Sequence, residues 1–186
     1  PFAREVVALD ETCLDQVARS LSALRDVPSG DAQLLPGRLA ALFDIRRQVW
    51  RRVDYASDPQ QNEKILARDM VCSLPAQSLI LADLGYFGFA WFDWLTDHEY
   101  YWISRLRRKT SYTVQHVFYQ KGDVFDGIVW LGAYRADRAA HAVRLVQFQI
   151  GTTAYRYITN VLDPHVLSIL SIAQLYARRW DIELAF

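Results

Sequence analysis

The chain has 186 residues, of which 52% are hydrophobic and 13% are aromatic. This length is enough for one compact domain, or for one domain that carries an insertion, and the composition excludes a disordered chain. Basic and acidic residues number 21 each, so the net charge of zero gives no argument for a polyanionic partner. No apolar run approaches the roughly 18 residues needed to span a bilayer, so we expect no membrane partner.

Cysteine usage and the two ends of the sequence give two further expectations. Cys13 and Cys72 lie far apart and lack the spacing of a metal site, so we expect buried free thiols in a reducing, cytoplasmic compartment. The chain begins at Pro1, just before a strand-like run, and stops at Phe186 inside a helical pattern that no Gly, Asn or Pro ends. We therefore expect a fragment of a longer protein.

The first apolar run, residues 6–9, leads into Asp10. An uninterrupted run of this kind is typical of a strand buried on both faces, and the polar residues 11–15 are expected to leave the sheet. Residues 37–44 and 49–53 then predict an antiparallel hairpin. The sequence Asp-Pro-Gln-Gln at 58–61 predicts a helix start with Asp as the N-cap.

Residues 79–82 show the same pattern as residues 6–9, because four apolar residues again precede an acid, Asp83. A buried helical turn is the alternative, but Pro75 and Gly85 favour a short strand. If the two strands are neighbours, Asp10 and Asp83 end side by side, since adjacent strands lie about 4.7–4.9 Å apart. Two carboxylates that close repel each other unless a proton or a cation lies between them, and a divalent metal suits their oxygens. In the simpler interpretation each Asp only caps a turn.

The order strand, hairpin, helix, strand resembles the front half of a ribonuclease-H-like fold, an α/β fold with a mixed sheet and flanking helices. Residues 87–98 predict a short aromatic helix in the core, and residues 100–107 predict another strand.

From residue 108 the pattern changes to alternation with turns, and four strands are predicted there: 112–118, 124–131, 142–150 and 154–159. We expect an all-β insertion domain at residues 108–160 that interrupts a catalytic domain made of residues 1–107 and 161–186. No Asp or Glu lies between residues 100 and 122, where five basic residues occur: Arg105, Arg107, Arg108, Lys109 and Lys121. They either face a polyanion or form an ordinary solvated sheet edge.

Residues 168–186 predict a helix on which Tyr176, Arg179 and Glu183 share one face, because they are spaced three and four apart. Trp180 lies near the same stripe, which indicates that this face points inward. An Arg and a Glu on an inward face are costly unless they are paired or bound to a ligand. The alternative is a common Arg–Glu pair on an exposed helix.

These residues also carry a family resemblance. Tyr176, Arg179 and Glu183 fit Y-x-x-R-x-x-x-E, which resembles the start of the signature of bacterial DDE transposases of the insertion-sequence-four family. Residues 82–86 (ADLGY) resemble the second acidic motif of that family, and residues 9–12 (LDET) resemble its first. The motifs occur in the right order, with a β-rich insertion between the second and the third.

The resemblance implies a ribonuclease-H-like catalytic domain in which Asp10, Asp83 and Glu183 bind two Mg²⁺ ions, with Mn²⁺ as a substitute. It implies that Tyr176 and Arg179 hold the DNA backbone beside the cleaved end. The expected activity is metal-dependent cleavage and strand transfer at transposon ends, in cut-and-paste transposition. The expected partner is double-stranded DNA, bound by a homodimer, in the bacterial cytoplasm at the nucleoid. Further DNA contacts are expected from the basic stretch: Arg105, Arg107 and Lys109.

Two other functions stay open. A decayed transposase remnant would bind DNA without cutting it, since Glu11 stands where the family usually has a small residue and the sequence lacks the Lys that ends the family motif, which would be residue 190. A metal-dependent nuclease would cut DNA without joining it. A small-molecule enzyme is disfavoured, because there is no glycine-rich phosphate loop and the histidines are scattered: His98, His116, His141 and His165.

Overall fold

The computed structural model describes residues 2–14, 25–26, 28, 37–56, 63–134 and 136–186. The strands are β1 (Val6–Cys13), β2 (Arg38–Asp44), β3 (Val49–Ala56), β4 (Leu79–Ala82), β5 (Tyr101–Arg105), β6 (Tyr112–Lys121), β7 (Val124–Leu131), β8 (Val143–Ile150) and β9 (Thr153–Thr159). The helices are α2 (Glu63–Val71), α3 (Phe89–Asp97), α4 (Ile169–Ala177) and α5 (Trp180–Ala185), with a short 3₁₀ helix η2 (Leu84–Tyr86).

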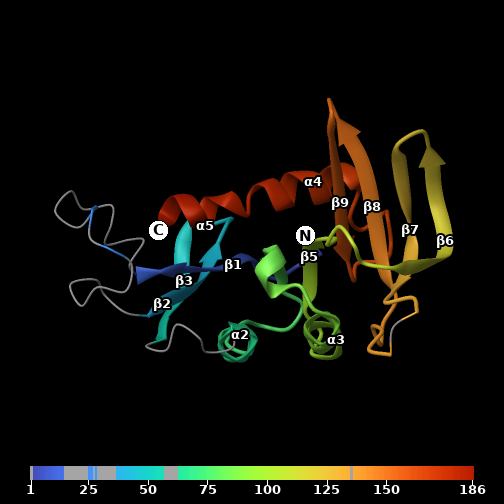
Figure 1. The fold of residues 1–186 in the computed structure, drawn as a ribbon. Helices are drawn as coiled ribbons and strands as arrows, with labels where there is room; N and C mark the ends of the chain where they lie inside the picture. Colours follow the sequence, from blue (N-terminus) through green and yellow to red (C-terminus); the bar gives the residue numbers. More distant parts are fainter. Residues whose placement is uncertain (1, 15–24, 27, 29–36, 57–62, 135) are drawn as a thin grey trace.

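These strands form one sheet in the order β3-β2-β1-β4-β5-β9-β8-β7-β6 (Figure 1). β1, β4 and β5 run parallel to one another, and the remaining neighbours are antiparallel. The protein is therefore mixed α/β, as predicted, with mostly antiparallel pairing. Of the helices in the described part of the chain, none is long and apolar enough to cross a membrane.

Helices cover both faces of the sheet, α2 and α3 on one side and α4 and α5 on the other (Figure 1). Because side chains alternate along a strand, β1 and β4 feed two separate cores. Leu9 and Ile80 pack with α2 and α3, whereas Ala8 and Leu81 pack with α4 and α5. All four residues of β4 are buried, which explains why its sequence is apolar throughout.

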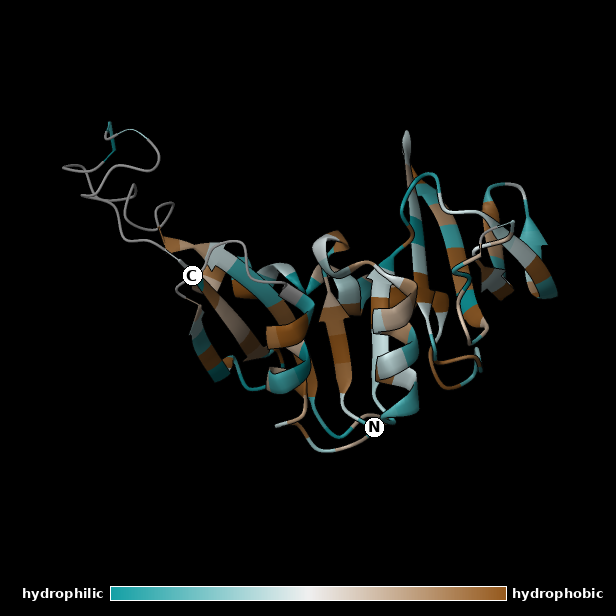
Figure 2. Cartoon of the chain, turned by 60° about the horizontal axis from the view of Figure 1, so that its bottom comes forward, coloured by the Kyte–Doolittle hydropathy of each residue, from teal (hydrophilic) through white to brown (hydrophobic). Residues whose placement is uncertain are grey.

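Hydropathy follows the depth of each strand in the sheet. The strands at the middle are mainly hydrophobic, whereas the outermost strand β6 mixes hydrophilic and hydrophobic residues (Figure 2). β6 is exposed at nearly every position, and two irregularities interrupt its pairing with β7. Irregular pairing of this kind at an edge strand discourages pairing with other chains.

Most predicted strands are confirmed, and several details differ. β1 does not end at Asp10, because residues 11–13 continue to pair with β2 although β4 has already ended. The predicted N-cap at Asp58 lies outside the described residues. Cys13 is half-buried and Cys72 is exposed, so the expectation of two buried thiols was wrong, although both are free.

The predicted single C-terminal helix is two helices. It breaks at Arg178 and Arg179, where the amide of Arg179 bonds to the carbonyl of Tyr176 at 3.1 Å in a tighter turn. Trp180, expected on the inward stripe, is 58% exposed. Tyr176 and Arg179 are buried, as predicted, and Ile182 is buried with them, but Glu183, also predicted to face inward, is exposed.

The strands of residues 112–159 continue the main sheet, because β9 pairs antiparallel with β5. Asn160 reinforces this junction: its side chain accepts a hydrogen bond from the amide of Trp102 at 3.0 Å and donates one to the carbonyl of Tyr100 at 2.8 Å. The domain boundaries at residues 108 and 160 remain a prediction.

A buried ion pair joins these strands to the helical layer. Arg144 on β8 is fully buried, and its guanidinium donates to both carboxylate oxygens of Asp126 on β7, at 2.6 and 2.7 Å. It also donates to the carbonyl of Leu167, just before α4, at 2.5 Å. One buried charge therefore fixes two strands and the entry to α4 together.

Asp126→Asn should lower the free energy of unfolding by about 3–5 kcal/mol, because it leaves the Arg144 charge buried beside a neutral amide. Urea denaturation followed by circular dichroism measures this. Asp123→Asn, in the exposed turn between β6 and β7, serves as the control and should change stability by less than about 0.5 kcal/mol. The double replacement Asp126→Leu with Arg144→Met should recover most of the loss, and equal losses in the two Asp variants would contradict the role of the pair.

Candidate functional site

The parallel pairing of β1 and β4 brings the two predicted aspartates together. Leu9 pairs with Ala82, so Asp10 and Asp83 follow at neighbouring positions on the same edge of the sheet. Both lie on the face that carries α4 and α5, because Ala8 and Leu81, two residues earlier, pack into that core. Open α/β sheets bind ligands at this carboxyl edge.

Helix α5 adds Glu183 and Arg179 to the same place. Nη1 of Arg179 donates to Oδ2 of Asp10 at 3.0 Å, and Nη2 donates to Oε1 of Glu183 at 2.6 Å. The Arg179 side chain is only 5% exposed, against 16% for Asp10 and 34% for Glu183. A buried guanidinium therefore bridges an acid from β1 and an acid from α5.

The charged groups of the site are close enough to shift the pKa values of Asp10 and Arg179. Burial raises the pKa of Asp10, and the negative charges of Glu183 and Asp83 raise it further. The Glu11 amide, which donates a hydrogen bond to Asp10 at 2.8 Å, and the positive charge of Arg179 lower it, but they do not outweigh burial. Burial lowers the pKa of Arg179, but its bond to Glu183 and its negative neighbours outweigh that effect, so the pKa is raised. The site thus concentrates negative charge around one cation.

Asp83 differs from the other two acids in its bonding. It precedes η2, is half-buried, and its carboxylate makes no hydrogen bond to any described residue. It nevertheless acts electrostatically on Asp10 and on Arg179. Its oxygens therefore stay available to a ligand beside the Arg179 bridge.

Tyr176 forms the floor next to these acids. It is 5% exposed, its ring packs against Tyr157 with 4.9 Å between centroids, and its hydroxyl donates to the carbonyl of Ala82 at 3.4 Å. Burial raises the pKa of Tyr176 well above its usual range, so the hydroxyl remains protonated and a hydrogen-bond donor. The Arg179 guanidinium lies 5.9 Å from the Tyr176 ring centroid.

Glu11 takes no part in this cluster. It points to the opposite face of β1 from Asp10, since neighbouring residues alternate, and it accepts from Arg38 of β2 at 2.5 Å. The additional acid beside Asp10 is therefore neutralised elsewhere.

The predicted metal site is not preformed. Within the part of the chain that the structure describes, no group of three or more His, Cys, Asp or Glu side chains is arranged to hold a metal ion. Asp10 and Glu183 share Arg179 instead.

The three basic residues predicted to contact DNA lie in different environments. Arg105 ends β5 beside Asp83 and influences Tyr176 electrostatically. Arg107 turns towards η2, donating to the carbonyl of Leu84 at 3.3 Å with its guanidinium 5.1 Å from the Phe87 ring centroid. Lys109 is exposed in the connection to β6.

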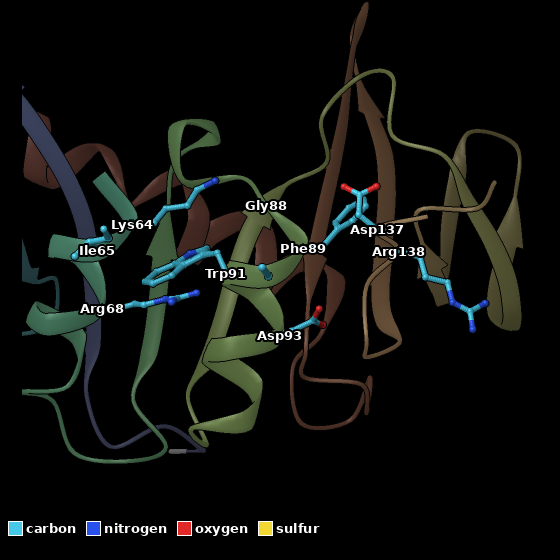
Figure 3. Close-up of a pocket in the computed structure, with 10 residues that line it drawn as sticks. Lys64, Ile65, Arg68, Gly88, Phe89, Trp91, Asp93, Asp137 and Arg138 are labelled. Atoms are coloured by element: carbon cyan, nitrogen blue, oxygen red, sulfur yellow. The ribbon is translucent and has the colours of Figure 1, made fainter. Parts of the chain in front are cut away.

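A cavity of about 490 Å³ lies on the opposite face of the sheet from the three acids, between α2, α3 and residues 137–138 (Figure 3). Its charged side chains are engaged: Lys64 Nζ donates to the carbonyl of Phe87, and Asp93 accepts from the amides of Ala140 and His141. Arg68 lies over the Trp94 ring at 5.4 Å. This cavity is therefore separate from the three acids and is held by structural contacts.

Sequence reasoning missed Arg156, which lines a cavity with Arg105 and Arg108. Arg156 lies on β9, the strand that pairs with the end of β5. The signal that could have found it is a basic residue within a half-buried strand, but only the strand pairing shows that it lies next to the basic stretch.

Arg179→Met should lower the free energy of unfolding by about 2–3 kcal/mol, because Asp10 loses its partner in a largely buried position. Arg178→Met is the matched control: Arg178 is 52% exposed and pairs with Asp181, so its loss should cost less than about 1 kcal/mol. Urea denaturation of both variants measures the difference. Equal losses in the two variants would show that the contacts of Arg179 with Asp10 and Glu183 contribute no more to stability than an exposed ion pair.

The family model described as a transposase DDE domain matches residues 3–186, whereas no curated protein sequence matches the chain. A cryo-EM structure of a piggyBac transposase synaptic complex with hairpin DNA is similar in fold, with a TM-score of 0.57 and 6% sequence identity. The similarity covers 98% of this chain but 39% of that one, so this chain spans well under half of that protein's length. With the family match extending over almost its whole length, the chain belongs to the transposase DDE domain family.

Proposed function

We propose that this chain is the catalytic part of a DNA transposase that cleaves and joins DNA at transposon ends by cut-and-paste transposition. The observation that carries the proposal is the gathering of Asp10, Asp83 and Glu183, from three separate elements, around Arg179. The membership in the DDE family supports it.

The fold is proposed to be ribonuclease-H-like, and the closer relationship is to the bacterial insertion-sequence-four family. β1, β2 and β3 form a meander, α2 crosses over, and β4 and β5 add parallel strands next to β1. Residues 112–159 enter between β5 and the C-terminal helices, where the family resemblance places its insertion.

The chemistry of the site suits hard divalent cations. Three carboxylates supply the oxygen ligands that Mg²⁺ prefers. Burial raises the pKa of Asp10, repulsion from Glu183 and Asp83 adds to this effect, and positive charge relieves both. Arg179 already supplies one such charge, so a divalent ion competes with it for Asp10 and Glu183. We propose that Asp10, Asp83 and Glu183 hold two Mg²⁺ ions, or Mn²⁺, when DNA is bound.

Bound divalent ions would generate the attacking oxygen at neutral pH and neutralise charge on the departing oxygen. The protein's own side chains position the substrate. Arg179, once released from a carboxylate, offers a planar fork that fits a phosphate in two places, which Lys does not reproduce. Tyr176, held protonated by burial, positions the Arg179 guanidinium against its ring.

The proposed partner is double-stranded DNA at the transposon ends and at the target, bound by a homodimer. The structurally similar piggyBac transposase is described in a synaptic complex with hairpin DNA, which supports a DNA partner. A cytoplasmic, nucleoid-associated location remains an expectation from the sequence.

Asp83→Asn in the full-length protein should abolish Mg²⁺-dependent cleavage of DNA, because it replaces with a neutral amide a carboxylate that makes no hydrogen bond to any described residue. DNA affinity should stay close to that of the wild type. Gel analysis of labelled DNA measures cleavage and joining, and fluorescence anisotropy measures binding. A product assay that finds cut but never joined DNA would favour a nuclease.

The control is Asp123→Asn, which removes the same charge from an exposed turn and should leave cleavage unchanged. Cleavage retained by Asp83→Asn would remove this residue from the active site and contradict the proposal.

A non-cleaving DNA-binding remnant is the second candidate, and the Arg179 bridge is the observation that favours it, since the guanidinium occupies the carboxylates in place of a metal. A calorimetric titration of the protein with Mn²⁺ separates the two functions. Arg179→Gln should raise Mn²⁺ affinity about tenfold, because hydrogen bonds to charged groups contribute about 1.5–3 kcal/mol and must otherwise be broken. Arg178→Gln should have no effect, and absence of Mn²⁺ uptake by any of the three proteins would favour the remnant.

A further inference from the structure

We propose that a cavity lined by Arg105, Arg108 and Arg156 binds a backbone phosphate of DNA next to the three-acid site. We call it the arginine pocket. The inference rests on the proposed function, because it assigns a contact to the DNA that the three acids would act on.

The charged residues that line the arginine pocket are all positive. The cavity has a volume of about 320 Å³, and its walls are three arginines with Leu106 and Ala154, without an acid. None of the three arginines forms an ion pair with a described residue; the contact of Arg156 is with the Tyr112 ring, at 5.7 Å. Arginine keeps its charge at any physiological pH, so this concentration of cations is relieved only by an anion.

Arg156 also presents a donor that the protein does not use. Its Nε is buried and has no hydrogen-bond partner in the described structure. A buried donor without an acceptor costs about 1–3 kcal/mol, and a ligand oxygen would remove that cost. The pocket volume is at the lower end of the roughly 300–1,000 Å³ typical of small-molecule sites, which suits a phosphate group.

Strand register places Arg105 beside the acids, whereas Arg156, two residues before Ile158, lies on the face of the sheet that carries α2 and α3. Leu81 of β4 pairs with Ile103 of β5, so Arg105 and Asp83 follow at neighbouring positions on adjacent strands. Both residues influence Tyr176 electrostatically. A DNA strand whose scissile phosphate lies at Asp83 would therefore meet the arginine pocket at Arg105, where the carboxyl ends of β4 and β5 lie next to each other.

The position also explains why two parts of the sequence contribute. Arg105 ends β5, Arg108 follows in the connection to β6, and Arg156 comes from β9, which pairs with β5. The pocket lies where the strands of residues 112–159 join the rest of the sheet. A phosphate bound there is contacted from both sides of this junction and carries no base information, so recognition is independent of sequence.

The test measures DNA binding by fluorescence anisotropy at several salt concentrations, using the full-length protein and matched duplexes of unrelated sequence. Arg156→Gln and Arg108→Gln should each weaken binding to all duplexes by a similar factor. Each should reduce the slope of log affinity against log salt by about one unit, as expected for loss of one phosphate contact. Arg156→Lys should keep part of the affinity, because it keeps the charge but loses the fork.

Arg4→Gln is the matched control: Arg4 is exposed at the amino end of β1, the opposite edge of the sheet, and should leave the slope unchanged. In Mg²⁺-dependent cleavage, Arg108→Gln should raise KM and leave kcat near the wild-type value, because the pocket holds the strand and touches no reacting atom.

Wild-type slope and affinity in both pocket variants, or an equal loss in Arg4→Gln, would overturn the proposal. Either result leaves the cleavage defect of Asp83→Asn unaffected, so failure of the pocket is distinguishable from failure of the proposed function. Arg108 is exposed, which guards the test against a variant that fails to fold.

Discussion

The parallel pairing of β1 with β4 is the constraint on which the site depends. Two strands that run the same way end at the same edge, so residues remote in sequence become neighbours without any further device. Leu9 opposite Ala82 is enough to bring Asp10 and Asp83 together. The price of parallel pairing is a crossover, which α2 supplies while it covers one face. The other face is left for α4 and α5, which complete the cluster.

Arg179 gives the cluster its stability in the absence of a ligand. Three acids at one edge repel each other, and the internal guanidinium offsets this repulsion with bonds to Asp10 and Glu183. The break between α4 and α5 contributes, because the tight turn at Arg178 and Arg179 directs the start of α5 towards the strand ends. Glu11 would have added a fourth charge, but its position on the opposite face pairs it with Arg38. Arg179 therefore offsets part of the negative charge of the three acids, and another cation can compete with it for Asp10 and Glu183.

The sequence predicted the parts of the fold that depend on local pattern. Apolar runs that end in an acid gave β1 and β4, and alternation with turns gave β6 to β9. The spacing in the last helical segment predicted that Tyr176 and Arg179 point inward, but Glu183, predicted on the same face, is exposed. What could not be predicted depends on partners remote in sequence. The continuation of β1 to Cys13 is decided by the pairing with β2, and a polar run gives no sign of it. The Arg144–Asp126 pair is invisible in sequence, because only the strand register brings two charges together inside the protein. The helix break was missed because an unbroken helix satisfies the same spacing.

The continuity of the sheet from β3 to β6 has a mechanical consequence. Swinging the outer strands relative to the acids would require rupture of the β5–β9 ladder, the Asn160 bonds and the Arg144 contact to Leu167 at the same time. These contacts hold strands β6 to β9 in a fixed position relative to the acids. The carboxyl ends of β1, β4 and β5 are therefore held at a fixed distance from the outer strands, and this spacing is set by the backbone itself.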